Sequence, residues 1–292
     1  MHMFANPGEV AARATWLEAR GFDGLRVADS QCLNADVWVE LGLAAAATAR
    51  LRLGPGVTNP VTRDLSVTAS AALTLQAETG GRALLGMGRG DTAVTELGRR
   101  PVPVADFEHA LERIRSYLDG SEVRLDGHSV RLRLAERALP PVPLEAAASG
   151  ARAIGAAARH ADRIAFSVGA EPARVRRAAE LAREAREREG LDPGGLRLGA
   201  YVVVAADPDR AAARALVRGV AAALAGFSLG GDLSDERLDD FAVAGPSGEC
   251  AERIAALGLD HLIVVPGSLG ADPRRAEEAN ARFADEVLPL LR

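Results

Sequence analysis

The chain has 292 residues, of which 48% are hydrophobic and 26% charged, and its formal net charge is −5. At this length roughly three quarters of the unfolded surface can be buried, so a core can form without disulfides or metals. The interspersed charges and the negative balance argue against a nucleic-acid or membrane surface, and no apolar run reaches membrane-spanning length. The sequence holds no lysine, which excludes lysine Schiff-base chemistry.

The two cysteines, Cys32 and Cys250, are too few for a disulfide framework and lack the neighbours that a zinc site needs. The N-terminal stretch 1–10 has no basic region followed by a long apolar core, so it does not have the pattern of a signal peptide. We therefore expect a cytoplasmic protein that binds no metal ion.

Short apolar runs rich in Val, Ile and Leu alternate with amphipathic helical patterns along the chain. We expect strands at residues 23–29, 50–56, 82–88, 141–148, 162–168, 197–205 and 261–267. Helical faces lie between them, as at Phe107, Leu111, Ile114 and Leu118. Prolines at 172, 208 and 246 mark helix starts, and glycines at 21, 120 and 190 mark helix ends.

Strands that alternate with helices indicate a parallel sheet, either open and doubly wound or closed as a (β/α)₈ barrel. The strand count and the length, close to the norm of about 250 residues, favour the barrel. The eighth strand can only come from residues 1–5, so we expect a shortened or missing first strand. Residues 1–292 are predicted to form one domain, with insertions near 121–139, which looks like a β-hairpin, and near 226–241.

Polar and glycine residues gather where the expected strands end, and the carboxyl ends of the strands carry the active site in barrels of this type. Asp29 and Ser30 follow the first clear strand, Arg89 to Thr92 follow the strand at 82–88, and Ser149 to Arg152 follow the strand at 141–148. In the last case the strand runs through Ser149 and Gly150 into a helix, whose free backbone N–H groups form an anion site.

Each of these positions also has a plain structural interpretation. Asp29 and Ser30 could cap the next helix, and Asp91 could cap a loop. The stretch "GMGRGD" (86–91) matches no full dinucleotide-binding motif, and tight packing explains its glycines equally well. Ser149 could be an ordinary helix N-cap.

The stretch "GPGVTNPVTR" (54–63) places two glycines and two prolines where a strand should end. The chain has no G-x-S-x-G elbow and no H-E-x-x-H motif. These features indicate a protein that holds a cofactor with its own reactivity.

Five segments taken together resemble the bacterial-luciferase-like superfamily: "GFDGLRVADSQ" (21–31), "LGPGVTNPVTR" (53–63), "GGRALLGMGRGDTAV" (80–94), "AAASGARAIGAAARHADRIAFSVG" (146–169) and "AGPSGECAERIAALGLDHLIVVPG" (244–267). Within it the chain resembles oxidoreductases of the methylenetetrahydromethanopterin reductase type, which depend on the deazaflavin coenzyme F-420. The resemblance covers about residues 8–292, and the family fold is a (β/α)₈ barrel.

The resemblance implies a non-proline cis peptide bond at Gly56-Val57, in a bulge that backs the cofactor ring; an ordinary Gly-Pro turn is the alternative. It also implies roles at the other strand ends. The implied cofactor contacts are Asp29, Ser30, Gly56, Val57, Thr58, Met87, Gly88, Gly90, Ser149, Gly150, Ala151 and Arg152. Asp91 and Asp29 are the implied catalytic residues, with Asp91 on the substrate side and the hydride coming from the cofactor's C5 carbon.

The resemblance leaves alternatives open. FMN, in a monooxygenase of the same fold, is the second candidate cofactor, and Arg152 with Arg274-Arg275 would favour the polyanionic tail of F-420. A paralogue without turnover is the third reading, because the first strand is thin and Ala151 stands where relatives usually have Pro. The expected partners are a small-molecule substrate and a second copy of the chain, packed through the Ala-rich helix at 36–49, whose alternative role is packing within the monomer.

Overall fold

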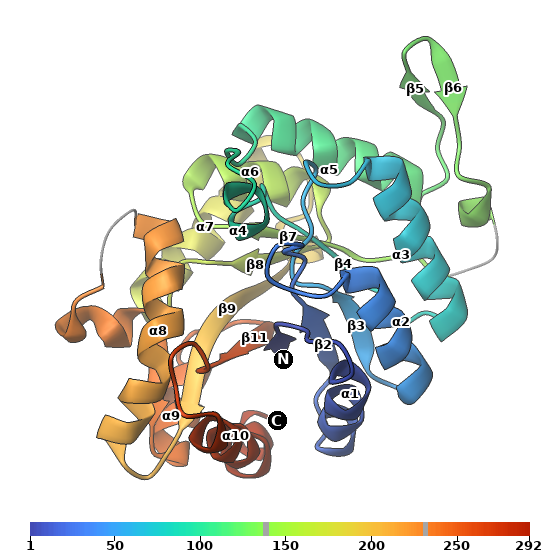
Figure 1. Ribbon diagram of the computed structural model, residues 1–292. Helices are drawn as coiled ribbons and strands as arrows, with labels where there is room; N and C mark the ends of the chain where they lie inside the picture. Colours follow the sequence, from blue (N-terminus) through green and yellow to red (C-terminus); the bar gives the residue numbers. More distant parts are fainter. Residues whose placement is uncertain (137–139, 230–232) are drawn as a thin grey trace.

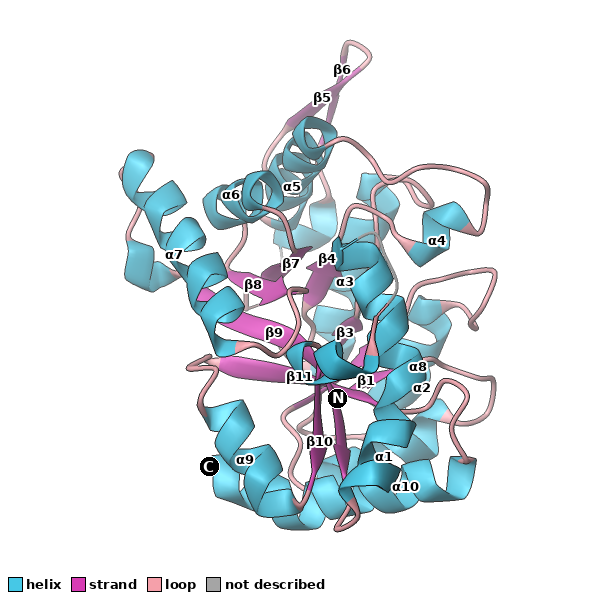
Figure 2. Cartoon of the chain, turned by 90° about the vertical axis from the view of Figure 1, so that its left-hand side faces the viewer, coloured by secondary structure: helices cyan, strands magenta, loops and turns pink. Residues whose placement is uncertain are grey.

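The computed structural model describes residues 1–136, 140–229 and 233–292 of the chain. Figure 1 shows short strands at the centre of the molecule with helices around them. In Figure 2, the short helix α4 (Thr92–Thr95) and the carboxyl terminus lie on opposite sides. Since α4 follows the carboxyl end of a strand, these sides correspond to the two ends of the strands, here called the carboxyl end and the amino end.

The parallel strands form two groups that curl toward each other. The first group has the order β1 (His2–Met3), β2 (Gly24–Val27) and β3 (Arg52–Pro55). The second runs from β4 (Leu85–Met87) through β7 (Leu144–Ala148) and β8 (Arg163–Phe166) to β9 (Arg197–Ala206). β11 (His261–Pro266) then pairs with β9 in parallel.

Two seams join the groups into a barrel. At the first, β3 and β4 are linked by isolated bridges, Leu53 with Ala83 and Thr58 with Met87. At the second, β1 lies in contact with β11, but no strand pairing joins them among the described residues. The expected (β/α)₈ barrel with a shortened first strand is therefore confirmed, since β1 spans only two residues.

The sequence analysis missed one strand, β10 (Ala242–Gly245). Its four residues pair with Val203 to Ala206 of β9. Val203 and Val204 also pair with β11, so β10 lies on the opposite side of β9, beyond the point where β8 ends. The run Ala-Val-Ala-Gly is short and has small side chains, so its β-propensity is weak.

Helices follow most strands, as the alternating pattern predicted. They are α1 (Val10–Ala19), α2 (Val37–Ala47), α3 (Leu65–Thr79), α5 (Val104–Leu118), α6 (Ala151–His160), α7 (Pro172–Arg188), α8 (Arg210–Leu229), α9 (Ser247–Ala255) and α10 (Pro273–Arg282). The expected face of α5 is buried at all four of its positions. Local signals set the ends: Asp36 and Asp64 accept backbone N–H groups at the starts of α2 and α3, and Gly80 ends α3 in the left-handed region.

The strands are buried on both faces, as parallel sheets require. Leu25, Val27 and Leu53 belong to the main apolar core, which also includes buried residues of most of the helices. A second apolar cluster joins Ala165, Tyr201 and Val203 to the inner face of α8. The rigid strands therefore hold the loops at both ends in fixed positions.

The first insertion is a β-hairpin of β5 (Val123–Leu125) and β6 (His128–Val130), which projects from the body in Figure 1. Its turn residues Asp126 and Gly127 both have positive φ, which fits the predicted Asp-Gly hairpin. The second insertion contains a 3₁₀ turn at Asp235–Asp240. Residues 137–139 and 230–232, which complete the two predicted insertions, lie outside the described residues.

Candidate functional site

The stretch after β3 leaves the regular strand at residues 56–57 and forms a bulge. The Gly56-Val57 peptide bond is cis, as expected. Hydrogen bonds hold the bulge on both sides: the Gly56 N–H donates to the Val27 carbonyl at 2.7 Å, and the Thr58 N–H donates to the Gly86 carbonyl at 3.0 Å. The ring of His2 contacts the Gly56 carbonyl oxygen through Nε2 at 2.8 Å. A carbonyl only accepts, so this nitrogen carries the proton.

The glycines of this region are required by close contacts. A Cβ at Gly54 would lie 1.8 Å from the Leu84 carbonyl oxygen, and one at Gly56 would lie 2.6 Å from Cβ of Arg26. A Cβ at Gly88 would lie 2.8 Å from Val57. The backbone at these three glycines therefore lies closer to its neighbours than a side chain would allow, which explains the glycines at 54 and 56. The packing interpretation of "GMGRGD" is also confirmed.

Asp29 lies at the end of β2 beside the bulge and is 5% exposed. Its carboxylate accepts a hydrogen bond from the Thr58 hydroxyl at 2.6 Å, and the Arg63 guanidinium lies 4.0 Å away. Burial raises the pKa of Asp29, although the Thr58 hydrogen bond and Arg63 act in the opposite direction. Asp29 does not cap the next helix, because Asp36 occupies that position.

Asp91 stands at the end of the β4 loop, directly before α4. Its side chain caps nothing, and among the described residues it has no hydrogen bond or ion pair. The side chain is exposed, yet the surrounding protein removes enough water to raise the pKa of Asp91, against the attraction of Arg89. A free carboxyl group with a raised pKa is typical of a proton donor or acceptor.

The Asp29 and Asp91 loops are tied together. The Gln31 side chain donates from Nε2 to the Ala93 carbonyl at 2.7 Å, which links the loop after β2 to α4. This contact was not anticipated, because Gln31 and Ala93 are far apart in the sequence. Ser30, between Asp29 and Gln31, is half-buried.

The N-terminus of α6 is open. Gly150 is the N-cap, with extended backbone and no side-chain cap, so Ser149 does not cap the helix. Ser149 to Arg152 are all exposed, and nothing lies within 4 Å of a Cβ placed on Gly150. The first N–H groups of α6 are thus available to an anion, and the helix dipole favours one there.

Two expectations at this end need correction. Met87 is fully buried in the main core, because alternation along β4 turns its side chain away from the face of Gly86 and Gly88. It therefore offers no surface to a ligand. Arg274 and Arg275 stand at the start of α10, which lies far from α6 in both views, so they are not beside the open helix terminus (Figures 1 and 2).

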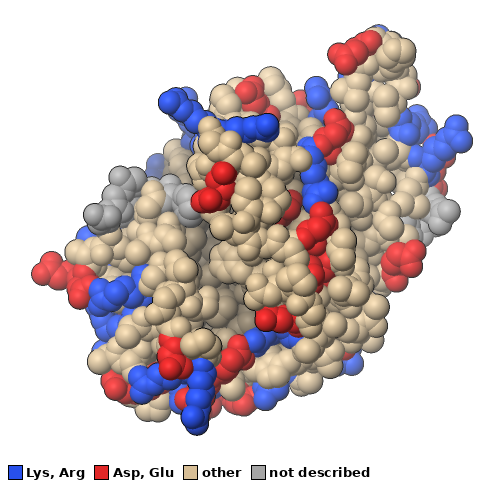
Figure 3. Space-filling model, viewed as in Figure 1, with Lys and Arg blue, Asp and Glu red and all other residues tan. Residues whose placement is uncertain are grey.

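The surface between these groups is largely uncharged. Val57 and Ala147 are half-buried and pack against the second apolar cluster. Figure 3 shows uncharged side chains over most of the middle of the face that carries α4, with charged ones more frequent toward its margin. Within the described residues no group of His, Cys, Asp and Glu could hold a metal ion.

These features define a class: a (β/α)₈ barrel whose carboxyl end combines an uncharged surface, a free carboxyl group and an uncapped, exposed helix N-terminus. The model of the luciferase-like monooxygenase family matches residues 3–260. The chain belongs to the luciferase-like monooxygenase family, which confirms the resemblance.

Curated relatives include two archaeal 5,10-methylenetetrahydromethanopterin reductases. The enzyme from Methanolobus tindarius is 27% identical over 283 residues, which covers 85% of this chain and 86% of the relative. The enzyme from Archaeoglobus fulgidus is 28% identical over 318 residues, covering 94% and 93%. The chain therefore spans nearly the whole length of these relatives.

Solved structures agree on the fold. The coenzyme F-420-dependent tetrahydromethanopterin reductase from Methanopyrus kandleri has a TM-score of 0.80 at 22% identity, with 100% of this chain and 98% of that chain covered. An F-420-dependent secondary alcohol dehydrogenase has a TM-score of 0.83 at 20% identity, with the same coverage. A monooxygenase from Streptomyces bottropensis has a TM-score of 0.73 at 22% identity, covering 96% and 92%.

Proposed function

We propose that this chain is an oxidoreductase that transfers a hydride between coenzyme F-420 and a small organic substrate with a C=N, C=C or C=O group. The observation that carries the proposal is the open α6 terminus beside an uncharged surface at the carboxyl end. The names of the two archaeal reductases support the same reaction class. When bound, the coenzyme supplies or accepts the hydride, and the chain supplies position and protons.

The residues present fit this coenzyme. A phosphate group needs several N–H donors without competing side chains, and the exposed, uncapped stretch from Ser149 to Arg152 offers them. A planar ring needs an apolar surface, and half-buried Val57 on the bulge offers one. Gly88, whose missing Cβ lets Val57 approach, keeps this surface in place.

We propose that Asp91 donates the proton that the substrate takes up when it is reduced. Its carboxyl group is unpaired and reaches solvent, so a substrate can approach it. The raised pKa keeps a larger fraction of Asp91 protonated near neutral pH than an ordinary Asp would have. Asp29 is nearly buried and held by Thr58, so we assign it to the cofactor side of the site, together with Ser30 and Gly90.

The Asp91 assignment has a direct test. Asp91→Asn should lower kcat by about a hundredfold while leaving F-420 binding intact, because proton transfer by a positioned group typically contributes about 10²–10⁴-fold. Rate in the reduction direction should fall as pH rises through the raised pKa of Asp91 and lose this dependence in the variant. Unchanged kcat in Asp91→Asn would remove Asp91 from the mechanism. Asp106→Asn, an exposed residue on α5, is the matched control.

FMN is the second candidate cofactor, because a monooxygenase from Streptomyces bottropensis shares the fold. The deciding experiment titrates the purified protein with oxidised F-420 and, separately, with FMN, and follows fluorescence. Binding of F-420 alone supports the proposal, whereas binding of FMN alone supports a monooxygenase. Binding of neither would indicate a paralogue without cofactor chemistry.

The same titration tests the anion site. Gly150→Asp places a carboxylate at the open helix terminus, where it should repel a phosphate and weaken F-420 binding by at least about tenfold. Gly150→Ala is the control, since its Cβ meets nothing within 4 Å. An F-420 affinity of Gly150→Asp equal to that of the unmodified protein would show that the phosphate binds elsewhere.

We also propose that the chain is a single-domain, cytoplasmic protein that works as a homodimer. The face formed by α2 and α3 supports the dimer, because Val39, Leu43 and Val67 are exposed there at 62%, 48% and 55%. A groove of about 720 Å³ between the helices is lined by small residues such as Gly42 and Ala71. No helix in the described ranges is long and apolar enough to cross a membrane. Val39→Glu should yield monomers in sedimentation analysis.

A further inference from the structure

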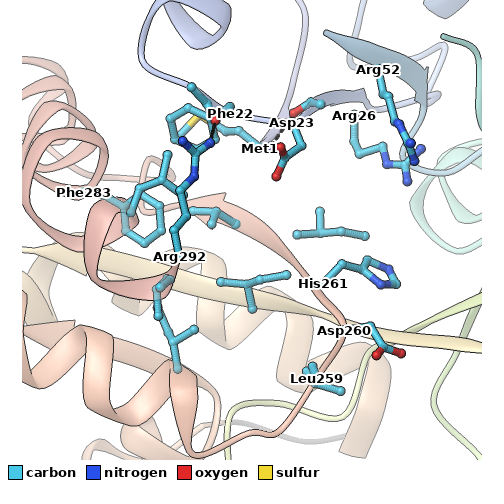
Figure 4. Close-up of a pocket in the computed structure, with 18 of the residues that line it drawn as sticks. Met1, Phe22, Asp23, Arg26, Arg52, Leu259, Asp260, His261, Phe283 and Arg292 are labelled. Atoms are coloured by element: carbon cyan, nitrogen blue, oxygen red, sulfur yellow. Dashed lines mark hydrogen bonds between the residues drawn. The ribbon is translucent and has the colours of Figure 1, made fainter. Parts of the chain in front are cut away.

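A cavity of about 950 Å³ opens at the amino end of the barrel, on the side away from the proposed cofactor site. It lies where the first residues of several strands meet, and Figure 4 shows it in close-up. Phe22 and Phe283 lie on one side of it together with Arg292, and Arg26 and Arg52 lie on the other (Figure 4). A volume near 1,000 Å³ is within the usual range for small-molecule sites, about 300–1,000 Å³.

The polar wall is dominated by arginines from four strands. We call Arg26 of β2, Arg52 of β3, Arg163 of β8 and Arg197 of β9 the amino-end arginines; all four line the cavity. Arg26 is 9% exposed, so its charge is largely removed from water. Four cations that converge on one cavity raise the local positive potential, most strongly where the walls are apolar.

One buried carboxylate, that of Glu145, forms ion pairs with two of the amino-end arginines. Glu145 of β7 lies 2.9 Å from Arg26, 3.1 Å from Arg163 and 3.0 Å from Nε2 of His261. Burial alone would raise the pKa of Glu145, but the two arginines and the contact with His261 hold it at about 2. Glu145 therefore stays ionised, but its charge is shared by two arginines.

The outer pair, Arg52 and Arg197, has no carboxylate partner among the described residues. Two acidic groups at the cavity are engaged by backbone donors: Glu18 accepts from residues 49–51, and Asp260 accepts from the Leu198 N–H at 2.7 Å. Asp23, a third acidic side chain that lines the cavity, is exposed. Positive charge thus exceeds negative charge at this end, whereas the chain as a whole has a net charge of −5.

We propose that the amino-end cavity binds a small anion with two or more negative charges, held by the amino-end arginines. Guanidinium groups bind phosphate and carboxylate in a planar, two-point manner, and partial burial strengthens such contacts. The ligand would neutralise the outer pair, which the protein leaves without a partner. This site is separate from the proposed cofactor site and does not depend on the proposed function.

The test is calorimetric titration of the full chain with inorganic pyrophosphate and with citrate at low ionic strength, with acetate as the monovalent comparison. One molecule of pyrophosphate or citrate should bind, and acetate should not. Preference for pyrophosphate assigns a phosphate ligand, and preference for citrate assigns a polycarboxylate. Affinity should fall as salt is added, because the contacts are ionic. No binding of either polyanion at low salt would overturn the proposal.

Variants locate the site. The double variant Arg52→Gln/Arg197→Gln should weaken binding by about tenfold or more, since each charged hydrogen-bond partner contributes substantially. Both residues are exposed at strand starts, so the fold should be retained, and circular dichroism checks this. Arg176→Gln, exposed on α7, is the control for net charge.

The open terminus of α6 could also take these anions, so Gly150→Asp is titrated in parallel. Binding that persists in Gly150→Asp and weakens in the arginine double variant supports the amino-end site. Binding that is lost in Gly150→Asp and unchanged in the double variant assigns the anion to α6 and overturns the proposal.

Discussion

The two ends of the barrel shift the pKa values of their carboxyl groups in opposite directions. At the carboxyl end, the pKa values of Asp29 and Asp91 are raised because water is partly removed and few cations are near. At the amino end, Glu145 is more deeply buried than either, yet its pKa is lowered to about 2 by the arginines and His261 around it. Nearby cations, rather than the depth of burial, therefore decide the charge state of a buried acid in this fold.

The first prediction removes the acid on which the amino end depends. Glu145→Gln leaves the buried Arg26 and the largely buried Arg163 without this counter-charge, and breaking such a group typically costs about 3–5 kcal/mol. Urea unfolding followed by circular dichroism measures the loss in the free energy of unfolding. Glu78→Gln, exposed on α3, should change it by less than about 0.5 kcal/mol. A loss below about 1 kcal/mol for Glu145→Gln would mean that the arginines find other partners.

The second prediction concerns how the free energy of unfolding depends on pH through His2. Burial lowers the pKa of His2 from 6.5 to about 4, so the unfolded chain binds more protons than the folded one between these values. Stability is then complete above pH 6.5 and falls as pH drops toward 4, by about 3 kcal/mol for this group. Urea unfolding at pH 7, 6, 5 and 4 follows the loss. His2→Gln should flatten the pH dependence, and an unchanged slope would assign it to other groups.

A third prediction probes the carboxyl end. Thr58→Val keeps the shape of the side chain but removes the donor to Asp29, which should cost about 1.5–3 kcal/mol at neutral pH. The pKa of Asp29 should rise further, because the lost hydrogen bond favours the ionised form. Nuclear magnetic resonance titration and urea unfolding measure the two effects. Thr74→Val, at an exposed position on α3, is the control. Equal effects of the two variants would show that the Asp29 contact is unimportant.

The smallest expected changes in stability come from replacing Gly199 or Gly150 by alanine. A Cβ on Gly199 would lie 2.2 Å from the His261 ring, which is packed at the amino end, so Gly199→Ala should cost about 1–3 kcal/mol. A Cβ on Gly150 meets nothing, and Gly150→Ala should change stability by less than about 0.5 kcal/mol. Thermal unfolding of both variants compares the crowded position at Gly199 with the open position at Gly150. Similar costs would contradict the difference in packing.

The fold was largely predictable because its signals are local. The apolar run of β9, the helix face of α5 and the Asp126-Gly127 turn each lie within a few neighbouring residues, and each prediction was confirmed. The strand β10 was missed because four small residues carry little signal. The cis bond at Gly56-Val57 was expected only from the family resemblance, since the local pattern also allowed an ordinary turn.

The site was predictable only in part. The strand-end position of Asp29, Asp91 and Gly150 follows from the barrel itself, and their assignment to cofactor and substrate remains a prediction. The cluster around Glu145 could not be predicted, because its partners come from β2, β8 and β11 and meet only in the folded chain. In the sequence Glu145 is one acid in a run of alanines, with no spacing that reveals its role.

The two free cysteines differ sharply in their surroundings. Cys32 is exposed on the loop after β2, two residues beyond Ser30. Cys250 is 1% exposed, and burial raises the pKa of its thiol to about 11, so it carries almost no reactive thiolate at neutral pH. A thiol-directed fluorophore should therefore attach at Cys32 alone, without any engineering of the chain. The natural protein thus carries a single labelling point at the rim of the proposed site, from which ligand arrival could be followed optically.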